Sequence, residues 1–490
     1  MLALLGGVWS GRAALREWRE GTTRPIPAVS APPPVPSVNR AWIEDPPRSR
    51  ERFALARERA SAIDPSAVPR LVEWLEPVGR ASFYRFGAPI VDAGATRAPA
   101  ASAVPASGGP FRIEYSLDEA LTDRVFEILR RGRVARGIVL VLDPRTGRLL
   151  TYAVTDPEAL PPGHAYPAAS IVKILTAAAL IESAPDRADP TCVYRGNKYR
   201  LSRRRVDRPR SGHRSSLRRA LASSNNRCFS QWAVHDVGQE RMEETLARFG
   251  WLEPPAPGHD AGELEAITTP ISLGRLGSGL DGIRVNPLHV ATLASVLTGG
   301  HAIEPWWVDR IVDAHGRSLE GIERPPPRPV ISRELADRLR RMLVSTTTSG
   351  TARSAFRDRR GRPLIPGVDV AGKTGNLTAG DPYGRYEWFL GLAPAKSPTI
   401  GVVVLQVQSN LWWMRSTELA AKVLREIFCD DGACAARLAN RWTGDLGDWT
   451  APLLISELDE GIGRSAAQRA AQASMSAARA AANGASVNPL

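Results

Sequence analysis

Hydrophobic residues recur along the middle of the chain with two different periods. Residues 117–131 follow a serine and carry apolar side chains at helical spacing, which predicts an amphipathic helix. Residues 137–154 then form two apolar runs separated by DPRTG, a composition typical of a β-turn. This stretch therefore predicts a helix followed by a β-hairpin.

Helical signals dominate between about residues 168 and 355, and β-type runs return after Pro366. Three such runs precede a last helical segment at 416–428; they cover residues 367–375, 385–394 and 399–408. One sheet that contains all five strands, with the helical block as an insertion, explains this order economically. We therefore expect an α+β fold: a five-stranded antiparallel sheet flanked by helices, plus a helical subdomain.

Composition divides the rest of the chain. Residues 1–21 begin with nine apolar residues, too few for a bilayer span of about 20; they are interpreted as a short signal or membrane-anchor remnant, or as neither. Residues 22–110 form a Pro- and Ala-rich linker with a small packed element near 66–86. Residues 111–436 form the predicted main domain. Residues 437–490 are an Ala-rich extension, either a marginal helix or disordered, with no assigned function.

The formal net charge is +13, which favours contact with anionic surfaces such as lipid headgroups or wall polymers. No zinc-finger pattern and no helix with basic residues at groove-reading spacing occurs, so nucleic acid is not an expected partner. Only five of the 64 basic residues are lysines. An ammonium group can lose its proton inside a protein and a guanidinium cannot, so the positions of the lysines are informative. Two of them, Lys173 and Lys373, lie in the motifs below.

The chain has four cysteines, without a CxxC pair or histidines at metal-binding spacing; they are Cys192, Cys228, Cys429 and Cys434. We expect no metal site and no cofactor. An even count is compatible with one or two disulfides in an oxidising compartment, or with reduced thiols. Three full pairings are possible, and proximity in sequence favours a bridge between Cys429 and Cys434.

Residues 166–182, YPAASIVKILTAAALIE, are almost entirely apolar, yet they contain Ser170 and Lys173. At a spacing of i and i+3, the two side chains share one helix face. A lysine desolvated by apolar neighbours has a lowered pKa and can accept the proton of a nearby hydroxyl. Taken alone, such a pair is more often a helix start with a snorkelling lysine.

Two more short motifs follow. Ser223 and Asn225 form S-x-N inside the helical segment 217–233, where a polar run is ordinarily a helix interruption. Lys373, Thr374 and Gly375 form K-T-G in a β-type run. An edge strand of this composition can pair with a peptide, hold its carboxylate and let it approach closely at the glycine. Each motif alone is weak evidence.

In this order, S-x-x-K, S-x-N and K-T-G match the motif set of penicillin-binding proteins and serine β-lactamases. The sequence resembles the penicillin-binding protein transpeptidase family over roughly residues 111–430, with further similarity in VNPLHVATLASVLTGG, SGTARSAF and YEWFLGLAP. The resemblance implies a D,D-transpeptidase that crosslinks peptidoglycan stem peptides through a serine acyl-enzyme and binds penicillin covalently.

The resemblance also implies roles for the motif residues. Ser170 is the nucleophile and Lys173 its base, while Lys373 belongs to the catalytic set. Ser223 relays a proton to the leaving amine, and Asn225 holds the substrate amide.

On the facing strand, Lys373 and Thr374 bind the terminal carboxylate of a D-alanyl-D-alanine peptide or of penicillin, beside Gly375. The oxyanion lies between the backbone N–H groups of Ser170 and Asn376. Asn376 stands where the family usually has Thr or Ser. This departure leaves open the preference for carboxypeptidase activity and the affinity for β-lactams.

A serine β-lactamase, a D,D-carboxypeptidase and a non-catalytic β-lactam or wall sensor are the alternatives. Glu253, Glu263 and Glu265 occur between the motifs, but none lies in the E-x-x-x-N context of a β-lactamase deacylating base. The intact motif set argues against a sensor. We expect action in the cell envelope, on the periplasmic or extracytoplasmic side, with anchoring to the inner membrane by the N-terminus. Stem peptides and β-lactams are the expected partners.

Overall fold

The computed structural model describes residues 42–43 and 111–443, except for 157–158, 188, 202–205, 257–258, 313–323, 381 and 409–412. The expectations for residues 1–21, for nearly all of 22–110 and for the extension beyond 443 fall outside this part. Among the helices within it, none is long and apolar enough to cross a membrane.

The core of the described domain is a five-stranded antiparallel sheet in the order β13-β14-β15-β3-β4. The early hairpin forms β3 (Gly137–Leu142) and β4 (Leu149–Val154), and the late strands are β13 (Ala371–Ala379), β14 (Gly384–Ala393) and β15 (Ile400–Gln408). Strand β15 pairs with β3 and so joins the two halves of the chain. The predicted α+β fold is confirmed.

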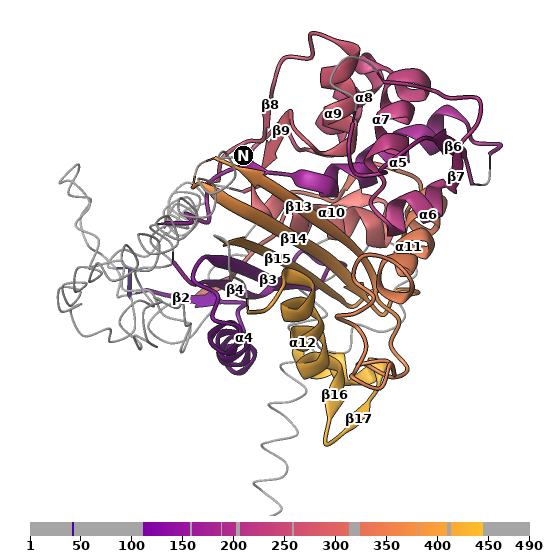
Figure 1. Ribbon diagram of the computed structural model, residues 1–490. Helices are drawn as coiled ribbons and strands as arrows, with labels where there is room; N and C mark the ends of the chain where they lie inside the picture. The colour runs from indigo at the N-terminus through magenta and orange to yellow at the C-terminus, as the bar shows by residue number, and fades with distance from the viewer. Residues whose placement is uncertain are drawn as a thin grey trace, which may run out of the picture. The chain divides into compact units, whose positions relative to one another are not determined.

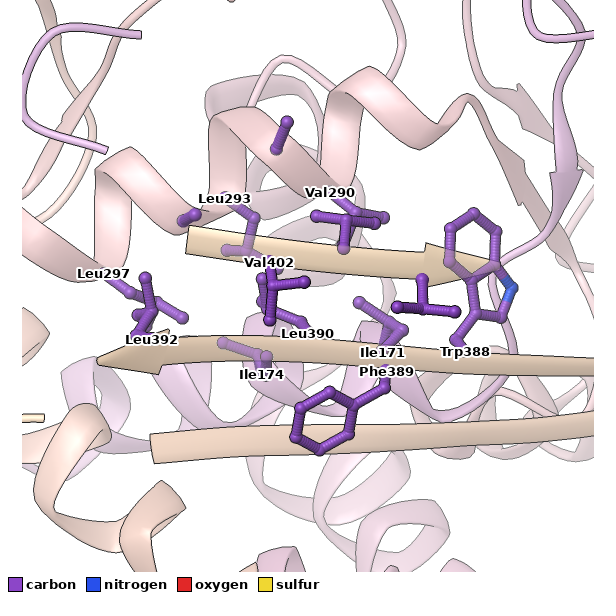
Figure 2. Packing of buried hydrophobic residues seen from close by; sticks show 14 of the residues in the cluster. Ile171, Ile174, Val290, Leu293, Leu297, Trp388, Phe389, Leu390, Leu392 and Val402 are labelled. Carbon is purple, nitrogen blue, oxygen red and sulfur yellow. The ribbon is translucent and has the colours of Figure 1, made fainter. Parts of the chain in front are cut away.

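Helices cover both faces of this sheet, and this explains its continuous apolar strands. All residues of β3 and β4 are buried, as in sheets covered on both sides. Helices α4 (Glu119–Arg131) and α12 (Ser416–Phe428) lie together below the sheet in Figure 1, and α10 (Pro287–Gly299) lies above it. Figure 2 shows the packing in the core, where Leu297 of α10 lies near Leu392 and Leu293 lies near Val402.

The inserted block forms the helical subdomain, with η1 and α5 at its centre. Its elements are η1 (Ala169–Val172), α5 (Lys173–Ser183), α6 (Leu217–Ala222), α7 (Asn226–Trp232), the π-helical turn η2 (Ala233–Val237), α8 (Gln239–Arg248), α9 (Pro270–Ser278) and α11 (Arg333–Thr348). Residues 173–181 of α5 are all buried. This accounts for the lack of a polar face in the sequence, because a helix enclosed on every side needs none.

Short strands complete the described part. They are β1 (Trp42–Ile43), β2 (Phe111–Tyr115), β5 (Tyr166–Pro167), β6 (Thr191–Tyr194), β7 (His213–Ser216), β8 (Glu263–Leu264), β9 (Ile283–Val285), β10 (His301–Ala302), β11 (Val308–Val312), β12 (Arg328–Pro329), β16 (Cys429–Asp430) and β17 (Ala433–Cys434), followed by η3 (Ala436–Ala439) and α13 (Asn440–Thr443). Strand β9 lies between β5 and β8.

All four cysteines form disulfides. Cys429 pairs with Cys434, as proximity favoured, and Cys192 pairs with Cys228. The Cys192–Cys228 bridge links β6 to α7, the helix that begins at the S-x-N region. The pairing settles the question that the cysteine count had left open.

Removing the two bridges is expected to have unequal effects. The Cys192–Cys228 bridge closes a loop of 36 residues and the Cys429–Cys434 bridge a loop of 5. The entropy that a crosslink removes from the unfolded chain grows with loop length. Replacing Cys192 and Cys228 by alanine should therefore lower the free energy of unfolding by about 3–4 kcal/mol, and replacing Cys429 and Cys434 by about 2 kcal/mol. Urea unfolding followed by circular dichroism measures both. A larger loss for the short loop would contradict this order.

Candidate active site

Ser170 and Lys173 lie in contact at the centre of the helical subdomain. Lys173 Nζ is 2.6 Å from Ser170 Oγ, and the lysine side chain is completely buried. Nζ also donates to Asn226 Oδ1 at 2.8 Å and to the carbonyl of Ser278 at 2.5 Å. Asn226 and the carbonyl of Ser278 therefore hold the amine against the serine hydroxyl.

The surroundings of Lys173 disfavour its charge. Burial, followed by the positive charge of Lys373, lowers the pKa of Lys173 well below its ordinary value of 10.5. A neutral amine at hydrogen-bond distance from a hydroxyl can accept its proton. The arrangement is suited to proton transfer from Ser170 to Lys173.

The serine of the S-x-N region lies one position later than predicted. Ser223 caps the end of α6: its Oγ donates to the carbonyl of Arg219 at 2.8 Å, and the residue is half-buried. Ser224 has a positive φ of 52°, which turns the chain after α6. Its Oγ accepts a hydrogen bond from Lys373 Nζ at 3.2 Å. The placement of Ser223 at the site is therefore corrected to Ser224.

The asparagine shifts in the same way. Asn225 is the N-cap of α7, where its side chain accepts a hydrogen bond from the backbone N–H of Cys228. Asn226 instead accepts from Lys173 and donates from Nδ2 to the carbonyl of Tyr199 at 2.8 Å. The sequence SSNN contains two overlapping S-x-N triplets, and the structure brings the second one to the lysines.

Strand β13 is one of the two edge strands of the sheet, and it brings the K-T-G residues to the site. Lys373 is completely buried and donates to Ser224 and, at 2.7 Å, to the carbonyl of Thr374. Burial lowers the pKa of Lys373 from 10.5 to about 7. Thr374 Oγ1 lies 2.7 Å from Thr351 Oγ1, and both side chains reach the surface. Thr351, within SGTARSAF, was not predicted as a site residue.

Two glycines let β13 and α9 approach the serine. A Cβ atom on Gly375 would lie 3.2 Å from the Cβ of Ala169, the residue before Ser170. A Cβ on Gly279 would lie only 1.9 Å from the carbonyl oxygen of Ala169, and Gly279 has a φ of +65°. Any larger residue at Gly279 would displace the segment that carries Ser170.

Asn376 is held by the neighbouring strand. Its Nδ2 donates to Glu387 Oε1 at 3.3 Å, and its Oδ1 accepts from Arg385 Nε at 3.0 Å. Glu387 is buried and also accepts from Gln406 at 3.1 Å. Asn376, which stands where the family usually has Thr or Ser, is thus hydrogen-bonded to two residues of β14.

Comparison with known proteins identifies this arrangement. Residues 137–428 match the family model described as "Penicillin binding protein transpeptidase domain". The chain belongs to this family. The penicillin-binding protein resemblance seen in the motifs is therefore confirmed, and the matched range lies within the predicted main domain of residues 111–436.

Curated relatives of this penicillin-binding protein domain are distant. Peptidoglycan D,D-transpeptidase PbpA of Mycobacterium tuberculosis is 24% identical over 312 residues, which cover 55% of this chain and 61% of the relative. Stage V sporulation protein D of Bacillus subtilis is 25% identical over 306 residues, covering 54% of this chain and 44% of the relative. The chain thus spans about three-fifths of the mycobacterial relative.

Solved penicillin-binding proteins share the fold. Penicillin-binding protein A of M. tuberculosis, in a ceftriaxone acyl-enzyme complex, has a TM-score of 0.55 at 20% identity, covering 69% of this chain and 81% of that one. Pseudomonas aeruginosa PBP2 has a TM-score of 0.54 at 20% identity, covering 68% and 84%.

Proposed function

We propose that this protein is a serine D,D-transpeptidase that crosslinks peptidoglycan stem peptides through an acyl-enzyme on Ser170 and binds penicillin covalently. The observation that carries the proposal is the buried Lys173 amine 2.6 Å from the Ser170 hydroxyl. Family membership and the names of the mycobacterial relatives support the same chemistry.

In the acylation step, Ser170 Oγ attacks the carbonyl of the penultimate D-alanine and passes its proton to Lys173. The oxyanion that forms is stabilised by the backbone N–H groups of Ser170 and Asn376. Ser224, which lies 3.2 Å from Lys373, delivers a proton to the leaving amine as the C–N bond breaks. The role first predicted for Ser223 thus passes to Ser224.

Binding groups line the other side of the cleft. The Lys373 ammonium and the hydroxyls of Thr374 and Thr351 hold the terminal carboxylate of the donor. Gly375 lets the peptide lie close to the edge of β13. Asn226 takes the place predicted for Asn225. Its Oδ1 orients Lys173, and its Nδ2, which donates one hydrogen to the carbonyl of Tyr199, offers the other to the substrate amide.

The partners of Lys173 favour transfer over rapid hydrolysis. In the described part of the chain, they are a hydroxyl, an amide and a backbone carbonyl, and no carboxylate bonds to Ser170 or Lys173. A β-lactamase of the class A type uses a carboxylate to activate the deacylating water. A long-lived acyl-enzyme awaiting an amine acceptor is therefore favoured.

Product analysis tests this function. The full chain is incubated with a stem-peptide donor ending in D-Ala-D-Ala and with a second stem peptide as amine acceptor, and products are separated by chromatography with mass detection. Crosslinked dimer, absent with Ser170→Ala, is expected. Release of D-alanine without dimer would make the protein a carboxypeptidase. In a separate incubation with penicillin, rapid destruction of the drug would make it a β-lactamase.

We further propose that the domain acts outside the cytoplasmic membrane, where peptidoglycan is crosslinked, with residues 1–21 contributing to membrane association. Two disulfides in the described domain favour an oxidising compartment. Fractionation of cells that produce the protein should recover it with the envelope. Recovery in the cytosol alone would contradict this location.

Acylation by penicillin is expected to fall at both low and high pH. Lys173 must be neutral to accept a proton, so protonation at low pH slows the reaction. Lys373 must be charged to attract the carboxylate, and its pKa of about 7 implies weaker attraction above that pH. The second-order rate constant, measured from about pH 5 to about pH 9 with circular dichroism as a folding control, should therefore pass through a maximum. A steady rise to the highest pH would contradict the role of Lys373.

A further inference from the structure

The positive charge of the chain is concentrated in one segment. Residues 189–227 contain twelve of the 64 basic residues and only two of the 51 acidic ones. This segment therefore carries a net charge of +10, out of +13 for the whole chain. It includes β6, β7 and α6 and ends one residue after Asn226. The function proposed above gives this charge no role.

Hydrogen bonds draw the parts of this segment together. Strand β6 pairs with β7 along its whole length, and α6 follows β7 directly. In the turn after β6, Arg195 Nε donates to the carbonyl of Ser211 at 2.8 Å. Arg227 Nε donates to the carbonyl of Asn197, in the same turn, at 2.9 Å. The turn therefore lies beside the start of β7 and the start of α7.

Five exposed arginines of the segment lack a carboxylate partner among the described residues. They are Arg200, Arg210, Arg214, Arg218 and Arg219. In the same part of the chain, Arg208 pairs with Asp236 at 2.8 Å. We call the five arginines the β6–β7 basic surface. Their uncompensated charge favours an anionic partner that can engage several guanidinium groups at once.

The β6–β7 basic surface adjoins the catalytic cleft. Helix α6, which carries Arg218 and Arg219, ends at Ser223, directly before the serine that bonds Lys373. A polymer that enters the cleft can therefore reach the basic surface with its neighbouring units.

The place of this surface in the domain favours a polymer over a membrane. In Figure 1, β6, β7 and α6 lie on the opposite side of the described domain from β2. Strand β2 is where the chain enters the domain from residues 1–110, whose first part we propose to associate with the membrane. The basic surface is thus remote from the end of the domain that leads to the membrane.

The substrate itself supplies repeated negative charge. Many stem peptides are attached to one uncrosslinked glycan strand, and each ends in a carboxylate. Lys373 and Thr374 hold one of these carboxylates at a time, so those of neighbouring peptides are free. A guanidinium group can bind a carboxylate through two hydrogen bonds, and several such contacts reinforce one another.

We propose that the β6–β7 basic surface binds carboxylates of stem peptides that neighbour the one in the cleft, and so holds the uncrosslinked peptidoglycan strand beside Ser170. This inference rests on the proposed function, because that function makes the strand the substrate. The surface thereby favours polymeric substrates over single peptides.

Binding of fluorescently labelled, uncrosslinked pentapeptide strands, followed by anisotropy, tests the proposal. All proteins carry Ser170→Ala, so that no acyl-enzyme forms. The surface variant adds Arg200→Gln, Arg210→Gln, Arg214→Gln and Arg218→Gln. It should bind the strand about tenfold more weakly, as for three or four exposed ion pairs of roughly twofold each. Methyl esterification of the strand and added salt should also weaken binding.

A matched control removes the same charge elsewhere. It carries Arg359→Gln, Arg360→Gln, Arg425→Gln and Arg437→Gln, four exposed residues outside the segment 189–227. Its affinity for the strand should change by less than about twofold. Circular dichroism checks that both variants are folded.

Four results would overturn the proposal: no binding of the strand by the Ser170→Ala protein, an unaltered affinity in the surface variant, an equal loss in the control, or undiminished binding of the esterified strand. Vesicles containing phosphatidylglycerol form a second arm. If they bound more tightly than the strand and lost this binding in the surface variant, the surface would belong to a membrane contact instead. Failure of the proposed function is a separate result: penicillin would leave no adduct on Ser170 of the unchanged chain, whatever the strand does.

Discussion

Lys173→Met is expected to slow the acylation of Ser170 by penicillin about 10²- to 10⁴-fold, the range that a positioned general base contributes. Methionine fills a similar volume but cannot accept a proton, and the hydroxyl 2.6 Å away loses its only nearby amine partner among the residues described. Intact-protein mass spectrometry over time after addition of penicillin measures the rate.

Two further variants test whether Lys173 acts as a base or by its charge, and whether the loss is specific to this lysine. Lys173→Arg keeps a cation that cannot be deprotonated in a protein, so it should be as slow as Lys173→Met. Lys422→Met, on the exposed side of α12, should acylate like the unchanged protein. If Lys173→Arg retained most of the rate, Lys173 would act by its charge and the assignment as base would be wrong.

Ser224→Ala is expected to reduce acylation about 10²-fold or more, whereas Ser223→Ala should change it by less than about twofold. The two serines are adjacent in sequence and differ in surroundings. Ser224 Oγ bonds Lys373, and Ser223 Oγ bonds the backbone of its own helix. Acylation rates of both variants are compared under one set of conditions, with thermal unfolding as a check of folding.

The reverse order would show that the first S-x-N triplet carries the chemistry. That outcome would restore Ser223 to the proton relay and would require α6 to end one residue earlier in the working enzyme. Equal losses would mean that neither hydroxyl acts alone in delivering the proton to the leaving amine.

The sheet could be predicted because its strands are long apolar runs and because the order of these runs along the chain is informative. Two runs before the helical block and three after it leave few ways to build one sheet, and β15 pairs with β3 as that order requires. The Ser170–Lys173 contact was also predictable, since a spacing of i and i+3 places both side chains on one helix face.

Other parts of the site depend on conformation that the sequence does not display. Which of the two S-x-N triplets in SSNN faces the lysines depends on where α6 ends and on the positive φ of Ser224. Asn225 is equally suited to cap α7 or to face a ligand, and capping prevails. Thr351 meets Thr374 only through tertiary packing, and the hold on Asn376 depends on the register that sets it opposite Glu387.

The central claim is that Ser170 forms the acyl-enzyme, and locating the penicillin adduct tests it most directly. The full chain and Ser170→Ala are treated with penicillin, weighed intact and then digested to find the modified peptide. We predict one long-lived penicillin per chain, on the peptide that contains Ser170, and none on the folded Ser170→Ala protein. An adduct that persists on Ser170→Ala, or no adduct on the folded unchanged chain without loss of the drug, would contradict the account.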